Sequence, residues 1–238
     1  MTDRAACLLT GRRRLHFLHI GKTGGTAIKA SLQNHRRTRE YVVFLRGHHF
    51  ALSDVPRGDA AFFILRHPVS RFVSGFNSRQ RQGQPRVFFP WQPAEAEAFA
   101  AFETPNDLAL ALSADDPDRR RAAQAAMRAI HHVRDTYVGH YLGPLDALMA
   151  RRDDILFIGF QERLDADFER LKTLLGLPAG LTLPSDPVVA HRRLDGQPTA
   201  LDAQAVKNLE TWYAEDIRLY EACRREFAVD GSPATPGP

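Results

Sequence analysis

The sequence of 238 residues contains only two cysteines and no long apolar run. Cys7 and Cys223 are too few for a disulfide framework, and their spacing matches no zinc-binding pattern. No apolar stretch approaches the ~20 residues that a transmembrane helix needs, and the first residues lack the features of a secretory signal peptide. These absences argue against a secreted or membrane-spanning protein, and we expect the chain in the reducing cytoplasm.

Lysine is also scarce, and charge is unevenly distributed. Only four of the 32 basic residues are lysines, so a lysine inside a motif is informative. Residues 1–90 contain 16 basic and 4 acidic residues, whereas residues 91–238 contain 16 and 24, which gives net charges of +12 and −8. The basic half indicates an anionic ligand. A non-enzymatic nucleic-acid-binding protein is an alternative, but no recognisable nucleic-acid module is present, and we expect no such partner.

Short apolar runs alternate with helical patterns along the chain. Strands are predicted at residues 15–20, 41–45, 61–65 and 155–160. Helices are predicted from Thr26, from Pro68 through Phe76, over 161–175 and over 202–227. This alternation favours an α/β fold of three layers, P-loop-type, with a mostly parallel central sheet flanked by helices.

Two stretches depart from this alternation. Residues 81–93 read as a loop, and residues 94–151 read as several helices interrupted at Pro105, Pro117 and Pro144. We therefore expect a helical insertion at about 94–151 within a single domain over 1–230, followed by a disordered tail at 231–238.

The strongest local signal is a glycine-rich turn between the first predicted strand and helix. It consists of Gly21, Lys22, Thr23, Gly24, Gly25 and Thr26. Glycines let backbone N–H groups approach an anion, the following helix points its positive end at the same place, and Lys22 adds a charge. The threonine hydroxyls add further donors. The turn predicts a phosphate or sulfate site; the alternative is an ordinary turn with a solvated lysine.

The turn does not fit the nucleotide pattern G-x-x-x-x-G-K-[ST], because His16 stands where the first glycine belongs. No apolar strand ends in an aspartate that would hold magnesium, and the strand at 61–65 is followed by Arg66 instead. These departures favour a metal-free site with cationic side chains. A P-loop kinase or NTPase using another nucleotide is the alternative.

Arg66 begins a second candidate anion site. A guanidinium at a strand end can hold a phosphate, and Ser74 follows two helical turns later. The two segments, HIGKTGGTAI and RHPVSRFVSGF, together resemble the 5′-phosphosulfate loop and the 3′-phosphate motif of sulfotransferases that use 3′-phosphoadenosine 5′-phosphosulfate (PAPS).

The likeness is closest to the carbohydrate-type branch, which includes heparan sulfate 2-O-sulfotransferase. FIGFQERLDADFERLKTLLGL and LETWYAEDIRLYEAC also resemble that branch. Gly21 and His67 depart from the residues usual there, which are proline and an aspartate or asparagine.

The resemblance implies in-line transfer of a sulfuryl group from PAPS to an acceptor hydroxyl, leaving 3′,5′-ADP and requiring no metal. The acceptor would be a carbohydrate, a glycolipid or a small metabolite. Lys22 would neutralise the leaving oxygen, and the glycine-rich turn would hold the 5′-phosphate. Arg66 and Ser74 would hold the 3′-phosphate, with Arg192 or Arg193 of the late loop as further ligands.

The acceptor hydroxyl needs a base. His48, in the segment GHHF, matches the proposed base of that branch, with His49 in reserve; the alternative is a capping or surface histidine pair. His19 directly precedes the glycine-rich turn and is expected to pack on the sheet, with a place in the donor site as the alternative. His131, His132 and His140 are expected at the surface rather than as metal ligands.

The loop after the second motif combines arginines with aromatic residues: Arg79, Arg81 and Arg86 with Phe88, Phe89 and Trp91. Such a combination suits an anionic acceptor, although an ordinary surface loop explains it equally well.

Overall fold

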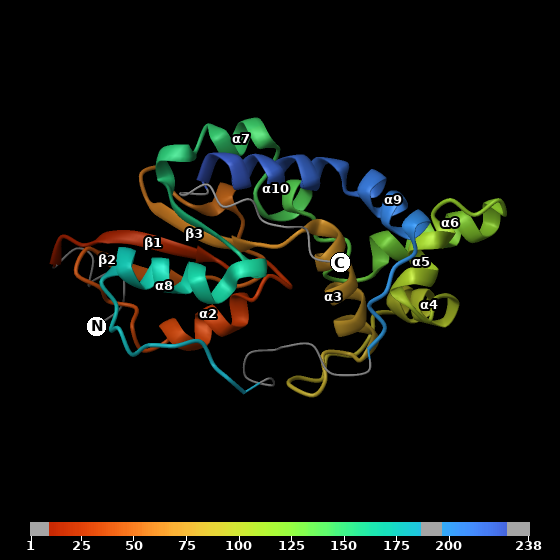
Figure 1. Cartoon of the computed structure of the whole chain (residues 1–238), viewed down its shortest axis with the longest axis horizontal. Helices are drawn as coiled ribbons and strands as arrows, with labels where there is room; N and C mark the ends of the chain where they lie inside the picture. Colours follow the sequence, from red (N-terminus) through yellow and green to blue (C-terminus); the bar gives the residue numbers. More distant parts are fainter. Residues whose placement is uncertain (1–9, 187–196, 228–238) are drawn as a thin grey trace.

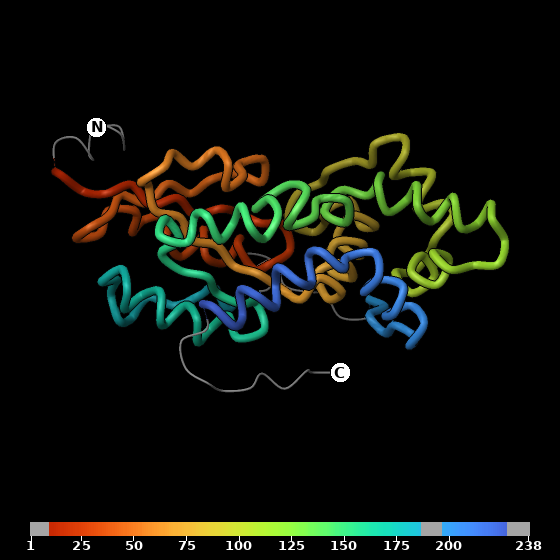
Figure 2. The backbone as a smooth tube through the Cα atoms, turned by 90° about the horizontal axis from the view of Figure 1, so that it is seen from above, coloured from red at the N-terminus to blue at the C-terminus, as the bar shows by residue number. Residues whose placement is uncertain are grey.

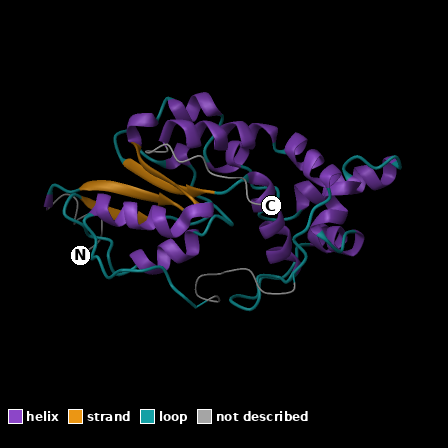
Figure 3. Cartoon of the chain, in the orientation of Figure 1, coloured by secondary structure: helices purple, strands orange, loops and turns teal. Residues whose placement is uncertain are grey.

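A four-stranded parallel sheet is the centre of the fold (Figures 1 and 3). The structure, a computed structural model, describes residues 10–186 and 197–227. The strands are β1 (Arg13–Leu18), β2 (Tyr41–Leu45), β3 (Ala60–Leu65) and β4 (Ile155–Phe160). Their order is β2-β1-β3-β4, and all pairs are parallel. The predicted α/β class with a parallel sheet is confirmed.

Alternating side chains of the strands build two apolar cores. In β3, Phe62 and Ile64 face one side, whereas Phe63 and Leu65 face the other, as the two-residue period of a strand requires. All six residues of β3 are buried. This explains its continuous apolar sequence, because a central parallel strand is covered on both faces.

Helices cover both faces of the sheet (Figure 1). On one face lie α2 (Gly25–Leu32) and α8 (Leu164–Leu175), which contribute Ile28, Phe168 and Leu171 to the core. On the other lie α7 (Leu145–Met149) and α10 (Ala214–Phe227).

The remaining helices form a lobe beside the sheet (Figures 1 and 2). They are α3 (Pro68–Gln80), α4 (Pro93–Ala101), α5 (Pro105–Ala111), α6 (Pro117–Ala129) and α9 (Ala203–Trp212). Pro105 and Pro117 begin helices, because a proline at the first helical position removes an N–H that has no partner within the helix. The lobe has its own core, which includes Phe72, Phe76 and Phe99.

The single helix predicted over 202–227 is wrong, since two helices meet at Tyr213. The buried Tyr213 hydroxyl donates a hydrogen bond to the Val133 carbonyl at 2.9 Å. Nearby, the Asp216 carboxylate accepts the N–H groups of Tyr137 and Val138 at 2.7 and 3.0 Å. Long-range polar contacts therefore set the break, with α9 in the lobe and α10 over the sheet.

The strand order creates a crevice at one edge. Because β1 lies between β2 and β3, the connections that leave β1 and β3 run to opposite sides, and ligands bind at such a switch point. Within the described part of the chain, no helix is long and apolar enough to cross a membrane. Arg192, Arg193 and the tail at 231–238 lie outside the described residues.

Candidate active site

The chain turns sharply between β1 and α2. Lys22 and Gly24 adopt left-handed backbone conformations, with φ of 68° and 86°. A side chain at Gly24 would meet the Leu164 methyl, and one at Gly25 would meet the His19 ring, so both positions need glycine. The turn thus leads directly into the N-terminus of α2, where unpaired N–H groups and the helix dipole favour an anion.

The Thr23 hydroxyl stays inside this turn. It is buried and donates to the Ile20 carbonyl at 3.0 Å. This hydroxyl therefore does not point to a ligand, in contrast to the prediction from the sequence. Gly21 is also engaged, because its N–H donates to the Tyr141 hydroxyl at 3.2 Å. Gly21 and Thr23 therefore shape the turn and do not line the cleft described below.

Arg71 fastens the turn to the rest of the site. Its Nε donates to the Gly21 carbonyl at 2.9 Å, and its Nη2 donates to the Asp135 carbonyl. The guanidinium also lies over the rings of Tyr137 and Tyr141, at 5.0 and 5.7 Å from their centroids. Both tyrosines belong to the π-helical turn η2 (Tyr137–Tyr141). In the sequence, the only sign of the role of Arg71 was its place as the second arginine of RHPVSRFVSGF.

Arg66 directly follows β3 and lies beside the glycine-rich turn. Its N–H donates to the Tyr137 hydroxyl at 2.9 Å, while that hydroxyl donates to the Arg66 carbonyl at 2.5 Å. Burial raises the pKa of Tyr137, so the phenol keeps its proton for this bond. The Arg66 side chain reaches across, and its Nη1 lies 3.5 Å from the Lys22 carbonyl. The two predicted anion motifs therefore meet.

The N-terminus of α3 is bound by a residue of the segment that follows β4. The His67 N–H donates to Glu162 Oε1 at 2.7 Å, and Pro68 occupies the first helical position. His67, where the resembled motif has an aspartate or asparagine, makes no side-chain cap for this helix. The carboxylate that serves this helix end comes from Glu162 instead.

A cleft of about 1310 Å³ opens at the switch point. Its walls include these predicted site residues: Lys22, Gly24, Gly25, Thr26, His48, Arg66 and Ser74. They come from the glycine-rich turn, the segment after β2, the end of β3 and the first turns of α3. A volume of this size accommodates a nucleotide-sized ligand.

The charge of Lys22 is strongly perturbed in the cleft. Its pKa falls from 10.5 to about 7. Burial is the largest cause, and nearby guanidiniums add to it, namely those of Arg81, Arg66 and Arg71. An anion bound among these cations would restore the charged form of Lys22. The cleft is therefore electrostatically prepared for a polyanion.

His48 projects from the segment after β2. Its Nδ1 lies 3.0 Å from the His19 carbonyl, which can only accept, so Nδ1 carries the proton and Nε2 has the free lone pair. Its ring lies on His19, with centroids 4.0 Å apart. Burial lowers the pKa of His48 to about 4, so the ring is neutral near pH 7. His49 is exposed and is not part of the cleft wall.

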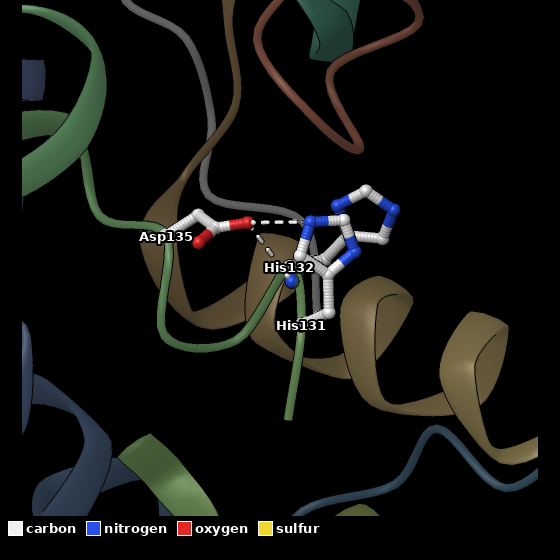
Figure 4. A group of neighbouring side chains, drawn as sticks. All are labelled: His131, His132 and Asp135. Atoms are coloured by element: carbon white, nitrogen blue, oxygen red, sulfur yellow. Dashed lines mark hydrogen bonds and ion pairs between the residues drawn. The ribbon is translucent and has the colours of Figure 1, made fainter. Parts of the chain in front are cut away.

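The histidines at residues 131 and 132 differ from the surface positions predicted for them. His132 lines the cleft, 5.5 Å from His48 between ring centroids. His131 pairs with Asp135, whose carboxylate oxygen lies 3.2 Å from His131 Nε2 (Figure 4). No periodic pattern in the sequence distinguished His132 from its neighbour.

The predicted arginine and aromatic loop divides into two parts. Arg79 is buried in an ion pair with Glu95 at 2.7 Å, which makes it a structural residue and not a contact for an acceptor. Arg81 lines the cleft instead, with its Nε donating to the Gln84 carbonyl at 2.6 Å. Phe88 and Phe89 are exposed on the same loop.

Comparison with known proteins agrees with this geometry. A search of curated proteins gives no match. The model of the sulfotransferase family matches residues 6–221, which include the glycine-rich turn, the Arg66 segment and all four strands. The chain therefore belongs to the sulfotransferase family.

Proposed function

We propose that this protein transfers the sulfuryl group of PAPS to an acceptor hydroxyl on a carbohydrate or glycolipid, as in the carbohydrate-type branch that its motifs resemble. One observation carries the proposal: the two anion motifs meet in one cleft, where Arg66 Nη1 lies 3.5 Å from the Lys22 carbonyl. A donor with phosphates at its 3′ and 5′ positions presents two anionic groups to such a pair.

The 5′-phosphosulfate binds at the glycine-rich turn. Gly24, Gly25 and Thr26 line the cleft at the N-terminus of α2, where backbone N–H groups and the helix dipole favour negative charge. Lys22 lies at the same turn and contacts the oxygen that bridges phosphorus and sulfur. No metal ion is needed, since the cations come from side chains.

The 3′-phosphate binds to Arg66 and Ser74. Both residues line the cleft, one at the end of β3 and the other in α3. Arg81 supplies further positive charge from the end of the same helix. Arg192 and Arg193 remain candidates for this phosphate from the late loop.

His48 acts as the base. Its Nε2 takes the proton from the acceptor hydroxyl while the acceptor oxygen forms its bond to sulfur. The bond from sulfur to the bridging oxygen breaks at the same time, and protonated Lys22 stabilises the charge that develops on that oxygen. A bound polyanion raises the pKa of His48 from about 4 towards the working pH, which strengthens it as a base.

A thermal-shift series with 3′,5′-ADP, 5′-ADP and ATP tests the donor assignment. We expect 3′,5′-ADP to raise the Tm most, because it alone places phosphates on both motifs. The Arg66→Met and Ser74→Ala variants should lose this preference but keep the response to 5′-ADP. A response to ATP with magnesium that exceeds the response to 3′,5′-ADP would contradict the proposal.

Acceptor transfer tests the base. With PAPS and a panel of carbohydrate and glycolipid acceptors, the His48→Asn variant should bind 3′,5′-ADP normally and lose at least about 100-fold in kcat. The His49→Asn variant is the matched control and should retain activity. Equal activity of the two variants would contradict the assignment.

A further inference from the structure

His132 occupies an unusual position in the cleft. Its backbone has a left-handed φ of 69°, which few residues other than glycine adopt. Its Nδ1 atom is shielded from solvent and has no hydrogen-bond partner among the described residues. A strained backbone and an unsatisfied buried nitrogen both cost free energy, so the combination points to a ligand.

The surroundings leave space for this ring on two sides. A side chain at Gly21 would lie 2.8 Å from His132 Nδ1, and one at Gly75 would lie 3.3 Å from the His132 carbonyl. Glycine at both positions allows the ring to lie against the glycine-rich turn and its backbone to lie against α3. The unsatisfied nitrogen thus lies against Gly21, the first residue of the turn that we assign to the phosphosulfate.

Asp135 and Arg71 hold the segment in place. The Asp135 carboxylate accepts the His132 N–H at 3.3 Å (Figure 4). The Asp135 carbonyl accepts a bond from Arg71. Because Arg71 also binds the Gly21 carbonyl, one guanidinium fixes both His132's turn and the glycine-rich turn. The ring is therefore pre-positioned against the donor site.

His131, His132 and Asp135 could in principle form a metal site, because their ligand atoms lie within 4.8 Å of one another. However, one Asp135 oxygen already accepts from both the His131 ring and the His132 N–H. The charges of Lys22 and Arg71 also act on His132. A site with these neighbouring cations favours an anion over a metal ion.

Burial, followed by the charge of Lys22, lowers the pKa of His132 well below its ordinary value. The ring is therefore neutral near pH 7 and carries one N–H. A neutral imidazole that donates a hydrogen bond adds no charge that would have to be desolvated, and it can stabilise a developing negative charge.

We propose that His132 is a ligand of the donor's sulfuryl group, with Nδ1–H donating a hydrogen bond to a sulfuryl oxygen between Lys22 and His48. This inference rests on the proposed function. His132 therefore distinguishes PAPS, which carries the sulfuryl group, from 3′,5′-ADP, which lacks it. It is a catalytic residue in addition to Lys22 and His48.

Binding measurements on two variants test this role without knowledge of the acceptor. His132→Gly relieves the left-handed strain and removes the ring, whereas His132→Asn tolerates the same backbone and keeps an amide donor near the Nδ1 position. We expect the glycine variant to bind PAPS about tenfold more weakly and 3′,5′-ADP within twofold of the wild type. The asparagine variant should retain the affinity for both within about threefold.

Three outcomes would overturn the role of His132. These are unchanged affinities for both nucleotides in the glycine variant, an equal loss of both, and stabilisation of the wild type by Zn²⁺ that the glycine variant lacks. The second would indicate a purely structural role, and the third a metal site. If the wild type binds neither nucleotide, the proposed function itself fails, which is distinguishable from all three.

Discussion

Arg71 Nε donates a hydrogen bond to the Gly21 carbonyl at 2.9 Å, from a side chain that is almost completely buried. Through this bond α3 holds the glycine-rich turn that follows β1. The other arm of the guanidinium reaches the Asp135 carbonyl, so three segments distant in sequence converge on one side chain. The geometry of the proposed donor site therefore depends on a residue that does not line the cleft.

Replacing Arg71 should destabilise the fold as well as the site. Arg71→Met leaves two buried carbonyls without partners, and we expect the free energy of unfolding to fall by about 2–4 kcal/mol. Arg71→Lys should recover only part of this loss, because a lysine ammonium cannot reproduce the two hydrogen bonds that the planar guanidinium donates to the two carbonyls. Urea unfolding measures both, with the exposed Arg121→Met as the control. If Arg71→Met had the same midpoint of urea unfolding as the control, the role of Arg71 in holding these segments together would be wrong.

Donor binding should take up a proton at Lys22. With a pKa of about 7, Lys22 is mostly neutral at pH 8, and a bound polyanion favours its charged form. Calorimetry of 3′,5′-ADP binding at pH 8, in buffers of different ionisation enthalpy, should report uptake of nearly one proton. Lys22→Arg, which stays protonated, should take up none. The absence of uptake by the wild type would refute the depressed pKa.

Stability should fall on acidification below neutral pH. Burial lowers the pKa of His16, His48 and His132, so below pH 6.5 the unfolded chain binds protons that the folded chain does not. For His48 this difference extends down to about pH 4. Stability is therefore present above pH 6.5 and lost as the pH falls, by up to about 1.4 kcal/mol per pH unit for each histidine. His48→Gln should flatten this dependence in chemical unfolding at several pH values. An unchanged slope in that variant would argue against the shift at His48.

Replacing Arg79 by methionine should reduce stability, whereas the same replacement of Arg81 should reduce ligand binding. Arg79→Met breaks a buried ion pair with Glu95, so we expect a loss of about 3–5 kcal/mol in unfolding free energy. Arg81→Met should leave stability nearly unchanged and weaken 3′,5′-ADP binding, because Arg81 lines the cleft and acts on Lys22. Unfolding and titration calorimetry separate the two effects. If Arg81→Met bound 3′,5′-ADP as tightly as the wild type, its place in the donor site would be wrong.

Local patterns predicted the strands and the glycine-rich turn well, because apolar runs and glycine spacing depend on neighbours in the chain. The boundaries were less accurate at β1, which ends at Leu18, two residues before the predicted end. Tyr213 illustrates the same limit. Its bond to the Val133 carbonyl ends α9, and a contact between residues 80 positions apart leaves no local signature.

The sequence alone predicted an anionic ligand and candidate residues for its site. Glycines, a rare lysine and Arg66 at a strand end predicted an anion site, and the concentration of basic residues in the first half agreed with it. Only the tertiary structure decided which of those residues line the cleft and which support it. It turned the Thr23 hydroxyl inward, buried Arg79 against Glu95 and brought His132 beside His48. The physical reason is that solvent exclusion and long-range hydrogen bonds, which select a side chain's role, arise only when distant segments pack together.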